Sequence, residues 1–107
     1  MAHPVRIDLT EKEYMQQIID LARLSGHYCY HTLDSRGSEP GMTDLLILKA
    51  TLERPLFVEV KTESGKLSPA QEAVKELLEA MPGADYRLWR PSSWPEVERT
   101  LLGRSRV

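Results

Sequence analysis

Three residues in the middle of the chain, Asp44, Glu59 and Lys61, have types and a spacing that could do chemistry. Asp44 comes at the start of one apolar run and Glu59 near the end of the next, so antiparallel pairing of two strands could bring both carboxylates to one sheet edge. Two carboxylates, a backbone carbonyl and water are oxygen ligands that suit Mg²⁺. Lys61 lies two residues after Glu59, which on a strand places its ammonium on the same face, able to neutralise a phosphate or orient a water. The pattern predicts metal-assisted hydrolysis of a phosphodiester bond.

The same residues also have an ordinary structural interpretation. An aspartate at the start of a strand is often a cap, and Glu-Val-Lys on an edge strand is often a solvated ladder of charges. The flanking runs Leu45–Leu48 and Leu56–Val60 look buried, however, and charged groups beside buried strands need partners or a metal ion. This placement favours the metal site.

The elements that must position these residues alternate between helical and strand patterns. The patterns predict a helix over 11–24, strands over 27–32, 43–50 and 56–61, a helix over 69–81, a strand over 85–90 and a last helix over 93–102. Thr10 with Glu13, and Ser68 with Pro69, mark the starts of the first two helices. Pro95 should interrupt the last helix near its start. The order predicts an α/β fold with a mixed sheet, in which a helix crosses over from a three-strand meander to the fourth strand.

The two central strands should differ in how they are covered. Leu45–Leu48 is a nearly continuous apolar run, which predicts a strand covered on both faces. The next strand alternates, with one face formed by Leu56, Val58 and Val60 and the other by Phe57, Glu59 and Lys61. A hairpin should join the two strands.

Length and composition bound the class of protein. A chain of 107 residues, 41% hydrophobic and 28% charged, suits one domain over residues 1–107. The only cysteine, Cys29, cannot form an internal disulfide, and residues 1–8 contain no long apolar run, so we expect a cytoplasmic protein that is neither secreted nor membrane-bound. These features do not distinguish a cellular protein from a phage-encoded one. The net charge of −2 gives no global positive field, so any DNA contact must be local.

Histidine and cysteine side chains alternate along the first predicted strand, where His27, Cys29 and His31 should point the same way. They could hold a transition metal, but no fourth ligand is evident and packing is favoured. His31 alone could touch a phosphate near the loop that leads to Asp44, although core packing is favoured.

Three further side chains could contact nucleic acid. Arg36 lies in the loop before Asp44, where its guanidinium could bridge two phosphate oxygens or simply be solvated. Trp89 and Trp94 could stack on bases, although packing is favoured for both.

Several motifs follow one another along most of the chain. They are Leu21-Ala22-Arg23-Leu24 with Gly26, Ser35-Arg36, Gly41-Met42-Thr43-Asp44-Leu45, Phe57-Val58-Glu59-Val60-Lys61, Gly65-Lys66-Leu67-Ser68-Pro69-Ala70-Gln71 and Leu88-Trp89-Arg90-Pro91. In order and spacing they resemble the VRR-NUC family of the PD-(D/E)XK nuclease superfamily. The resemblance implies a restriction-endonuclease-like αβββαβ core with a mixed sheet flanked by helices, followed here by a C-terminal helix.

The resemblance also implies roles for individual residues. Asp44, Glu59 and the backbone carbonyl of Val60 would bind Mg²⁺ or Mn²⁺, Lys61 would be the catalytic lysine, and Gln71 would be an auxiliary active-site residue. The candidate DNA contacts are His31, Arg36 and Lys66.

Two features depart from the family pattern. Thr43 stands where the family usually has a proline before the aspartate. Family members also tend to carry a glutamate on the first helix that faces the metal, and here the choice lies between Glu11 and Glu13. Glu11 falls on the core-facing stripe, whereas Glu13 points about 160° away from Ile18, so we favour Glu11. The closest family spacing would place an acid or amide nearer Met15.

These features together predict a divalent-metal-dependent endonuclease that acts on branched or junction DNA. A junction has two symmetric scissile positions and one chain offers one site, so we expect a C2 homodimer. The alternative is a non-catalytic module that binds nucleic acid or protein and keeps the nuclease fold, which Thr43 and the uncertain helix-one acid favour.

Overall fold

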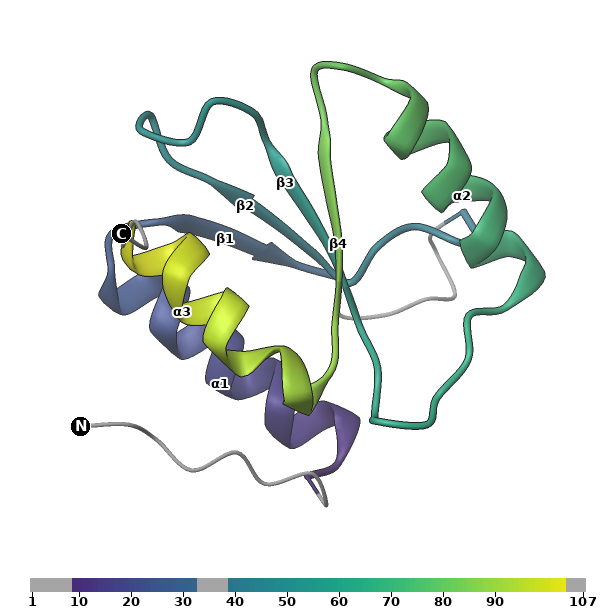
Figure 1. Cartoon of the computed structure of the whole chain (residues 1–107), viewed down its shortest axis with the longest axis horizontal. Helices are drawn as coiled ribbons and strands as arrows, with labels where there is room; N and C mark the ends of the chain where they lie inside the picture. The colour runs from purple at the N-terminus through teal and green to yellow at the C-terminus, as the bar shows by residue number, and fades with distance from the viewer. Residues whose placement is uncertain (1–8, 33–38, 104–107) are drawn as a thin grey trace.

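The computed structural model describes residues 9–32 and 39–103, so Arg36 lies outside the described residues. The elements are α1 (Glu11–Leu24), β1 (Tyr28–His31), β2 (Leu45–Leu48), β3 (Leu56–Val60), α2 (Pro69–Ala80), β4 (Asp85–Trp89), the 3₁₀ turn η2 (Pro91–Ser93) and α3 (Trp94–Leu102). One mixed sheet has the order β1-β2-β3-β4. The helices α1 and α3 lie together on one side of this sheet and α2 lies on the other (Figure 1).

The pairing of the strands confirms the predicted α/β topology. β1 pairs with β2 and β2 with β3 in antiparallel fashion, and β3 pairs with β4 in parallel. The hairpin register sets Leu45 against Val58, and the parallel register sets Glu59 against Leu88. The chain therefore returns through α2 to add a parallel strand beside the strand that carries Glu59.

Capping side chains begin the first two helices where the sequence predicts. The Glu13 N–H donates to Thr10 Oγ1 at 3.1 Å, and the Thr10 N–H donates back to Glu13 Oε1 at 3.0 Å. Ser68 begins α2 in the same way, with Pro69 in the first turn. The expectation that Pro95 interrupts the last helix is wrong. Pro95 lies in the first turn of α3, where no intrahelical N–H is needed, so α3 is continuous from Trp94.

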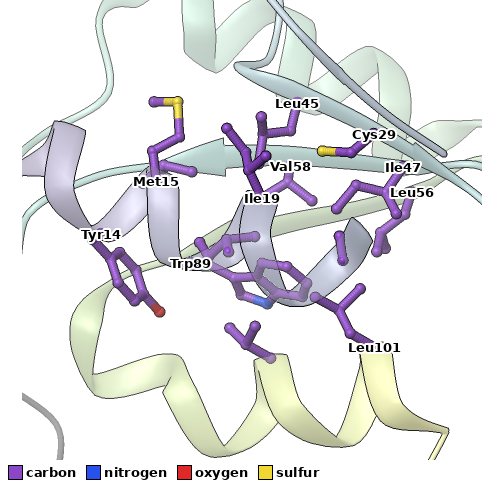
Figure 2. Packing of buried hydrophobic residues seen from close by; sticks show 14 of the residues in the cluster. Tyr14, Met15, Ile19, Cys29, Leu45, Ile47, Leu56, Val58, Trp89 and Leu101 are labelled. Atoms are coloured by element: carbon purple, nitrogen blue, oxygen red, sulfur yellow. The ribbon is translucent and has the colours of Figure 1, made fainter. Parts of the chain in front are cut away.

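The main core lies between the sheet and the α1–α3 layer. Figure 2 shows side chains of α1 and α3 meeting those of the sheet, among them Ile19, Val58, Trp89 and Leu101. Trp89 is fully buried, and its indole Nε1 donates to Glu96 Oε2 at 2.9 Å. The two tryptophans are packing residues, as favoured from the sequence, because Trp94 is also buried and its ring lies 6.2 Å from that of Tyr14.

The other face of the sheet is only partly covered, which corrects the prediction for β2. Leu46 is half-buried and Leu48 is 38% exposed, so among the described residues β2 is fully covered on one face only. α2 packs on β4, which forms the opposite edge of the sheet from β1 (Figure 1). Tyr28 and Tyr30, which pair with these leucines, are accordingly exposed. An unbroken apolar run predicts burial, but one helix is too narrow to cover four strands.

The loop before Asp44 packs tightly against the start of α2. Gly41 has φ +94°, and a Cβ placed there would clash with the Ala70 carbonyl oxygen and lie 2.7 Å from its carbonyl carbon. The Ala70 carbonyl belongs to helical backbone, which cannot move aside cheaply. Glycine at this position therefore lets the loop that carries Asp44 lie against the helix that carries Gln71.

Within residues 9–32 and 39–103, none of the helices has the length and apolar character needed to cross a lipid bilayer.

Gly41→Ala should lower the free energy of unfolding by about 2 kcal/mol or more, because it combines a positive φ with an overpacked contact. Gly83→Ala is the matched control, since a Cβ at Gly83 meets nothing within 4 Å. Urea unfolding of both variants measures the effect. Equal losses in the two variants would contradict the close approach of the loop to α2.

Candidate active site

Asp44 joins three strands at one end of the sheet. It directly precedes β2, and its side-chain Oδ2 accepts the Val60 N–H of β3 at 2.8 Å. Its backbone carbonyl accepts the Thr32 N–H, which follows β1, at 3.1 Å. These bonds place the Asp44 carboxylate at the end of β3, the strand that carries Glu59.

Glu59 is a buried carboxylate, with a side chain 1% exposed. Gln71 Nε2 of α2 donates to Glu59 Oε2 at 2.8 Å. The same amide accepts the Ser68 N–H on its Oε1, also at 2.8 Å, as part of the cap of α2. The cap therefore orients the Gln71 amide so that its donor end meets Glu59.

The two carboxyl groups face each other across the hairpin. Extending the Leu45–Val58 pairing by one residue sets Asp44 opposite Glu59. The pKa of Glu59 is raised to about 8, first by burial and then by the charge of Asp44 and a hydrogen bond between the two carboxyl groups, while the charge of Lys61 opposes the rise. Two such acids share a proton at neutral pH when no other cation neutralises them.

A third oxygen faces the same space. The Lys61 N–H donates to the Trp89 carbonyl of β4, so the peptide groups of Val60, one residue earlier, point the opposite way, toward β2. The Val60 N–H points toward β2, since it is bonded to Asp44. In a strand, the N–H and C=O of one residue point to the same side. The Val60 carbonyl is therefore directed to the Asp44 side of β3.

These oxygens fit a hard divalent cation. Among the described residues, no three His, Cys, Asp or Glu side chains are grouped to hold a metal. The donor set is thus two carboxylates and one carbonyl, which suits Mg²⁺ because this ion keeps several waters and needs few protein ligands. When both carboxyl groups are ionised, this pair needs a neutralising cation more than a solvated pair would.

Lys61 and Glu11 border this group from different elements. Lys61 directly follows β3 and is half-buried. Glu11 is in the first turn of α1, where burial raises the pKa of its carboxyl, the charge of Asp44 adds to the rise and that of Lys61 opposes it. Glu11 lies near enough to the site for the charges of Asp44 and Lys61 to act on its carboxyl, whereas Glu13 closes the cap of α1.

The remaining sequence candidates lie in different surroundings. His31 ends β1 next to Thr32 and lines a pocket of about 410 Å³ together with Glu11. Lys66 is exposed on the segment between Lys61 and α2.

The row of possible transition-metal ligands does not form. His27 is buried before β1, and its Nδ1 lies 3.1 Å from Ser25 Oγ and 3.2 Å from the Ala22 carbonyl oxygen. Cys29 points into the main core (Figure 2). His27 is thus engaged by the end of α1 while Cys29 packs among apolar side chains, which leaves His31 alone near the site.

Two features of the site go beyond the sequence reasoning. The Thr43 hydroxyl is buried and donates to the Leu45 carbonyl at 3.3 Å, so threonine is accommodated where the family usually has proline. Gln71 both caps α2 and holds Glu59. The pattern Ser68-x-x-Gln71 signals the cap, but it carries no sign of the second contact, which depends on how α2 packs on the sheet.

A mixed sheet with Asp44, Glu59 and Lys61 at its central hairpin and a helix following is the arrangement expected of the PD-(D/E)XK nuclease superfamily, in which the family match below places the chain. The sequence model of the VRR-NUC domain family matches residues 2–88, and the chain belongs to this family. Comparison with curated proteins and comparison with solved structures each found no significant match. Family membership makes the chain a nuclease domain that acts on DNA.

Glu59→Gln should change how the stability of the metal-free protein depends on pH. The native carboxyl has a pKa of about 8 and the ordinary value is 4.5, so the folded state keeps a proton that the unfolded chain releases between these values. The Glu59 contribution is therefore full below pH 4.5 and is lost as the pH rises through 8. Urea unfolding in the presence of a chelator should show this fall in the wild type and a flatter curve in Glu59→Gln. Parallel curves would contradict the buried acid pair.

Proposed function

We propose that the chain is a Mg²⁺- or Mn²⁺-dependent endonuclease that hydrolyses phosphodiester bonds, with the ion held by Asp44, Glu59 and the Val60 carbonyl. The observation that carries this proposal is the buried Glu59 carboxyl, which is hydrogen-bonded to Asp44. Burying such a pair costs free energy, and carboxyl groups with strongly shifted pKa values are concentrated at functional sites. Phosphodiester hydrolysis is a use that matches the nuclease family of the chain.

Each side chain has a separate task in this proposal. A divalent ion bound at the site would supply Lewis acidity toward a phosphate oxygen and a water of lowered pKa. The Val60 N–H holds Asp44 in place, and the Gln71 amide holds Glu59. Lys61 follows Glu59 on the same strand face, and its ammonium would donate to the attacking water or to the charged phosphate oxygens. Glu11 adds negative charge at the border of the site.

The proposed substrate is branched or junction DNA, and the proposed assembly is a C2 homodimer. A junction presents two equivalent scissile positions, which two copies of a one-site chain would match. The net charge of −2 favours recognition through local contacts, for which His31 and Lys66 are the described candidates. Arg36 is a third candidate from the sequence.

The alternative, a binding module without catalysis, has lost part of its support. It was favoured by Thr43, but the buried Thr43 hydroxyl is bonded to the Leu45 carbonyl and Asp44 still reaches β3. The two functions differ in whether the acidic pair binds an ion and in whether Lys61 matters for turnover.

Lys61→Ala should slow cleavage of a four-way junction with Mn²⁺ by about 10²–10³-fold, because the charge that develops on phosphate loses a fixed donor. Single-turnover assays with labelled DNA measure the loss. Lys49→Ala, at the opposite end of β2, is the control and should cleave at the wild-type rate. If Lys61→Ala were as active as the wild type, the catalytic proposal would be removed.

Asp44→Asn should abolish Mn²⁺ binding in a calorimetric titration, because an amide neither carries charge nor neutralises the ion. Asp20→Asn changes an exposed carboxylate on α1 that accepts a hydrogen bond from Gln16 of the same helix, and it should leave binding unchanged. A wild type that binds no Mn²⁺, or binds it equally well as Asp44→Asn, would support the non-catalytic module instead.

A further inference from the structure

One arginine holds the segment that follows Lys61. Arg90, the residue after β4, directs its Nη1 to the carbonyl oxygens of Thr62 at 2.7 Å, Gly65 at 2.6 Å and Glu63 at 3.2 Å. All three acceptors belong to the turn that connects β3 to the segment leading into α2. The contact joins parts of the chain that are 25 to 28 residues apart in the sequence.

A second contact fixes the same turn. Both carboxylate oxygens of Glu63 accept from Ser92, one from its N–H at 2.7 Å and the other from its hydroxyl at 2.8 Å. The turn itself is tight, since the Gly65 N–H donates to the Thr62 carbonyl at 3.2 Å and a Cβ at Gly65 would lie 2.9 Å from Thr62 Oγ1. The turn is thus bound at its backbone and at one side chain to the end of β4 and η2.

The Arg90 contact is of a kind that few side chains can make. Three carbonyl dipoles converge on one point, and without a donor there they would repel one another and lose their hydrogen bonds. The guanidinium is charged at every relevant pH, and its planar shape presents donors in a fixed direction. Arg90 therefore stabilises one conformation of the turn.

We infer that Arg90 is a positioning residue for the nuclease reaction, acting through Lys61. This inference rests on the proposed function. Lys61 is the last residue before the turn, and its own N–H is bonded to Trp89, the residue before Arg90. The end of β4 thus holds the backbone on both sides of the Lys61 side chain. The Nη1 of Arg90 bonds backbone carbonyls of the turn, so the task assigned to Arg90 is to set where the Lys61 ammonium lies.

The test compares Arg90→Gln and Arg90→Lys with the wild type in steady-state junction cleavage with Mn²⁺. Arg90→Gln should lower kcat by about 10- to 100-fold, as expected when a catalytic group is misplaced by about 1 Å, and leave KM and Mn²⁺ affinity unchanged. Arg90→Lys should recover part of the loss, because an ammonium offers three donors but not the guanidinium shape. Arg54→Gln is the matched control, an exposed arginine whose Nη1 bonds one backbone carbonyl, that of Pro82, at 3.5 Å, and it should behave as wild type.

A double-mutant cycle separates this role from a general effect on the fold. In the Lys61→Ala background, under single-turnover conditions, adding Arg90→Gln should cost nothing further, because the residue through which Arg90 acts is gone. Losses that multiply in the double variant, a wild-type kcat in Arg90→Gln, or a fall in Mn²⁺ affinity would each overturn the inference.

Amide hydrogen exchange gives a readout that does not depend on cleavage. In Arg90→Gln, and more weakly in Arg90→Lys, the Gly65 and Lys66 amides should exchange faster while the β2 and β3 amides keep their protection. Unchanged exchange in the turn would refute the claim that Arg90 holds the turn, even in an active enzyme. If the wild type cleaves no DNA, the proposed function fails and the catalytic role of Arg90 fails with it, whereas faster exchange would still show that Arg90 holds the turn.

Discussion

The structure is organised around a buried carboxyl that meets a second carboxyl. Glu59 points away from the main core, into the layer between β3 and α2, and Asp44 approaches it from the start of β2. Bringing two acids together in a buried place costs free energy that other contacts must supply. The Val60 N–H, the Gln71 amide and the charge of Lys61 each reduce that cost. A cation bound between the two carboxyl groups would reduce the remaining cost, as the proposed function requires.

Most of the surrounding architecture serves to keep those few groups in register. The α1–α3 layer supplies the stable core, and because the apolar face of β3 packs there, its other face is left for Glu59 and Lys61. Gln71 has two roles at the start of α2, because it accepts the Ser68 N–H in the cap and also donates to Glu59. Gly41 allows the loop before Asp44 to lie on that same helix. The groups that the proposed chemistry uses therefore lie on strands and helices or directly beside them, which favours accurate positioning.

Local rules allowed much of this arrangement to be predicted. Alternation along β3 separates Val58 from Glu59, and antiparallel pairing of two adjacent runs is enough to bring Asp44 opposite Glu59. The capping signals at Thr10 and Ser68 depend only on residues within one turn, so these helix starts could be predicted as well.

The features that could not be predicted depend on distant parts of the chain. The open face of β2 follows from where α2 packs, which an unbroken run of leucines does not reveal. The tolerance of α3 for Pro95 depends on where the preceding 3₁₀ turn ends. The bond from Gln71 to Glu59, and the Arg90 contacts with the turn after Lys61, join residues 12 to 28 positions apart. Such long-range contacts leave no periodic or local signature in one sequence.

The central claim is that two carboxylates and one carbonyl converge on a single divalent ion. Anomalous diffraction from crystals soaked in Mn²⁺ tests it most directly. The account predicts one strong peak within about 2–2.5 Å of oxygens from Asp44, Glu59 and the Val60 carbonyl. An ion bound elsewhere with none at this place, or two carboxylates turned to opposite faces of the sheet, would contradict it.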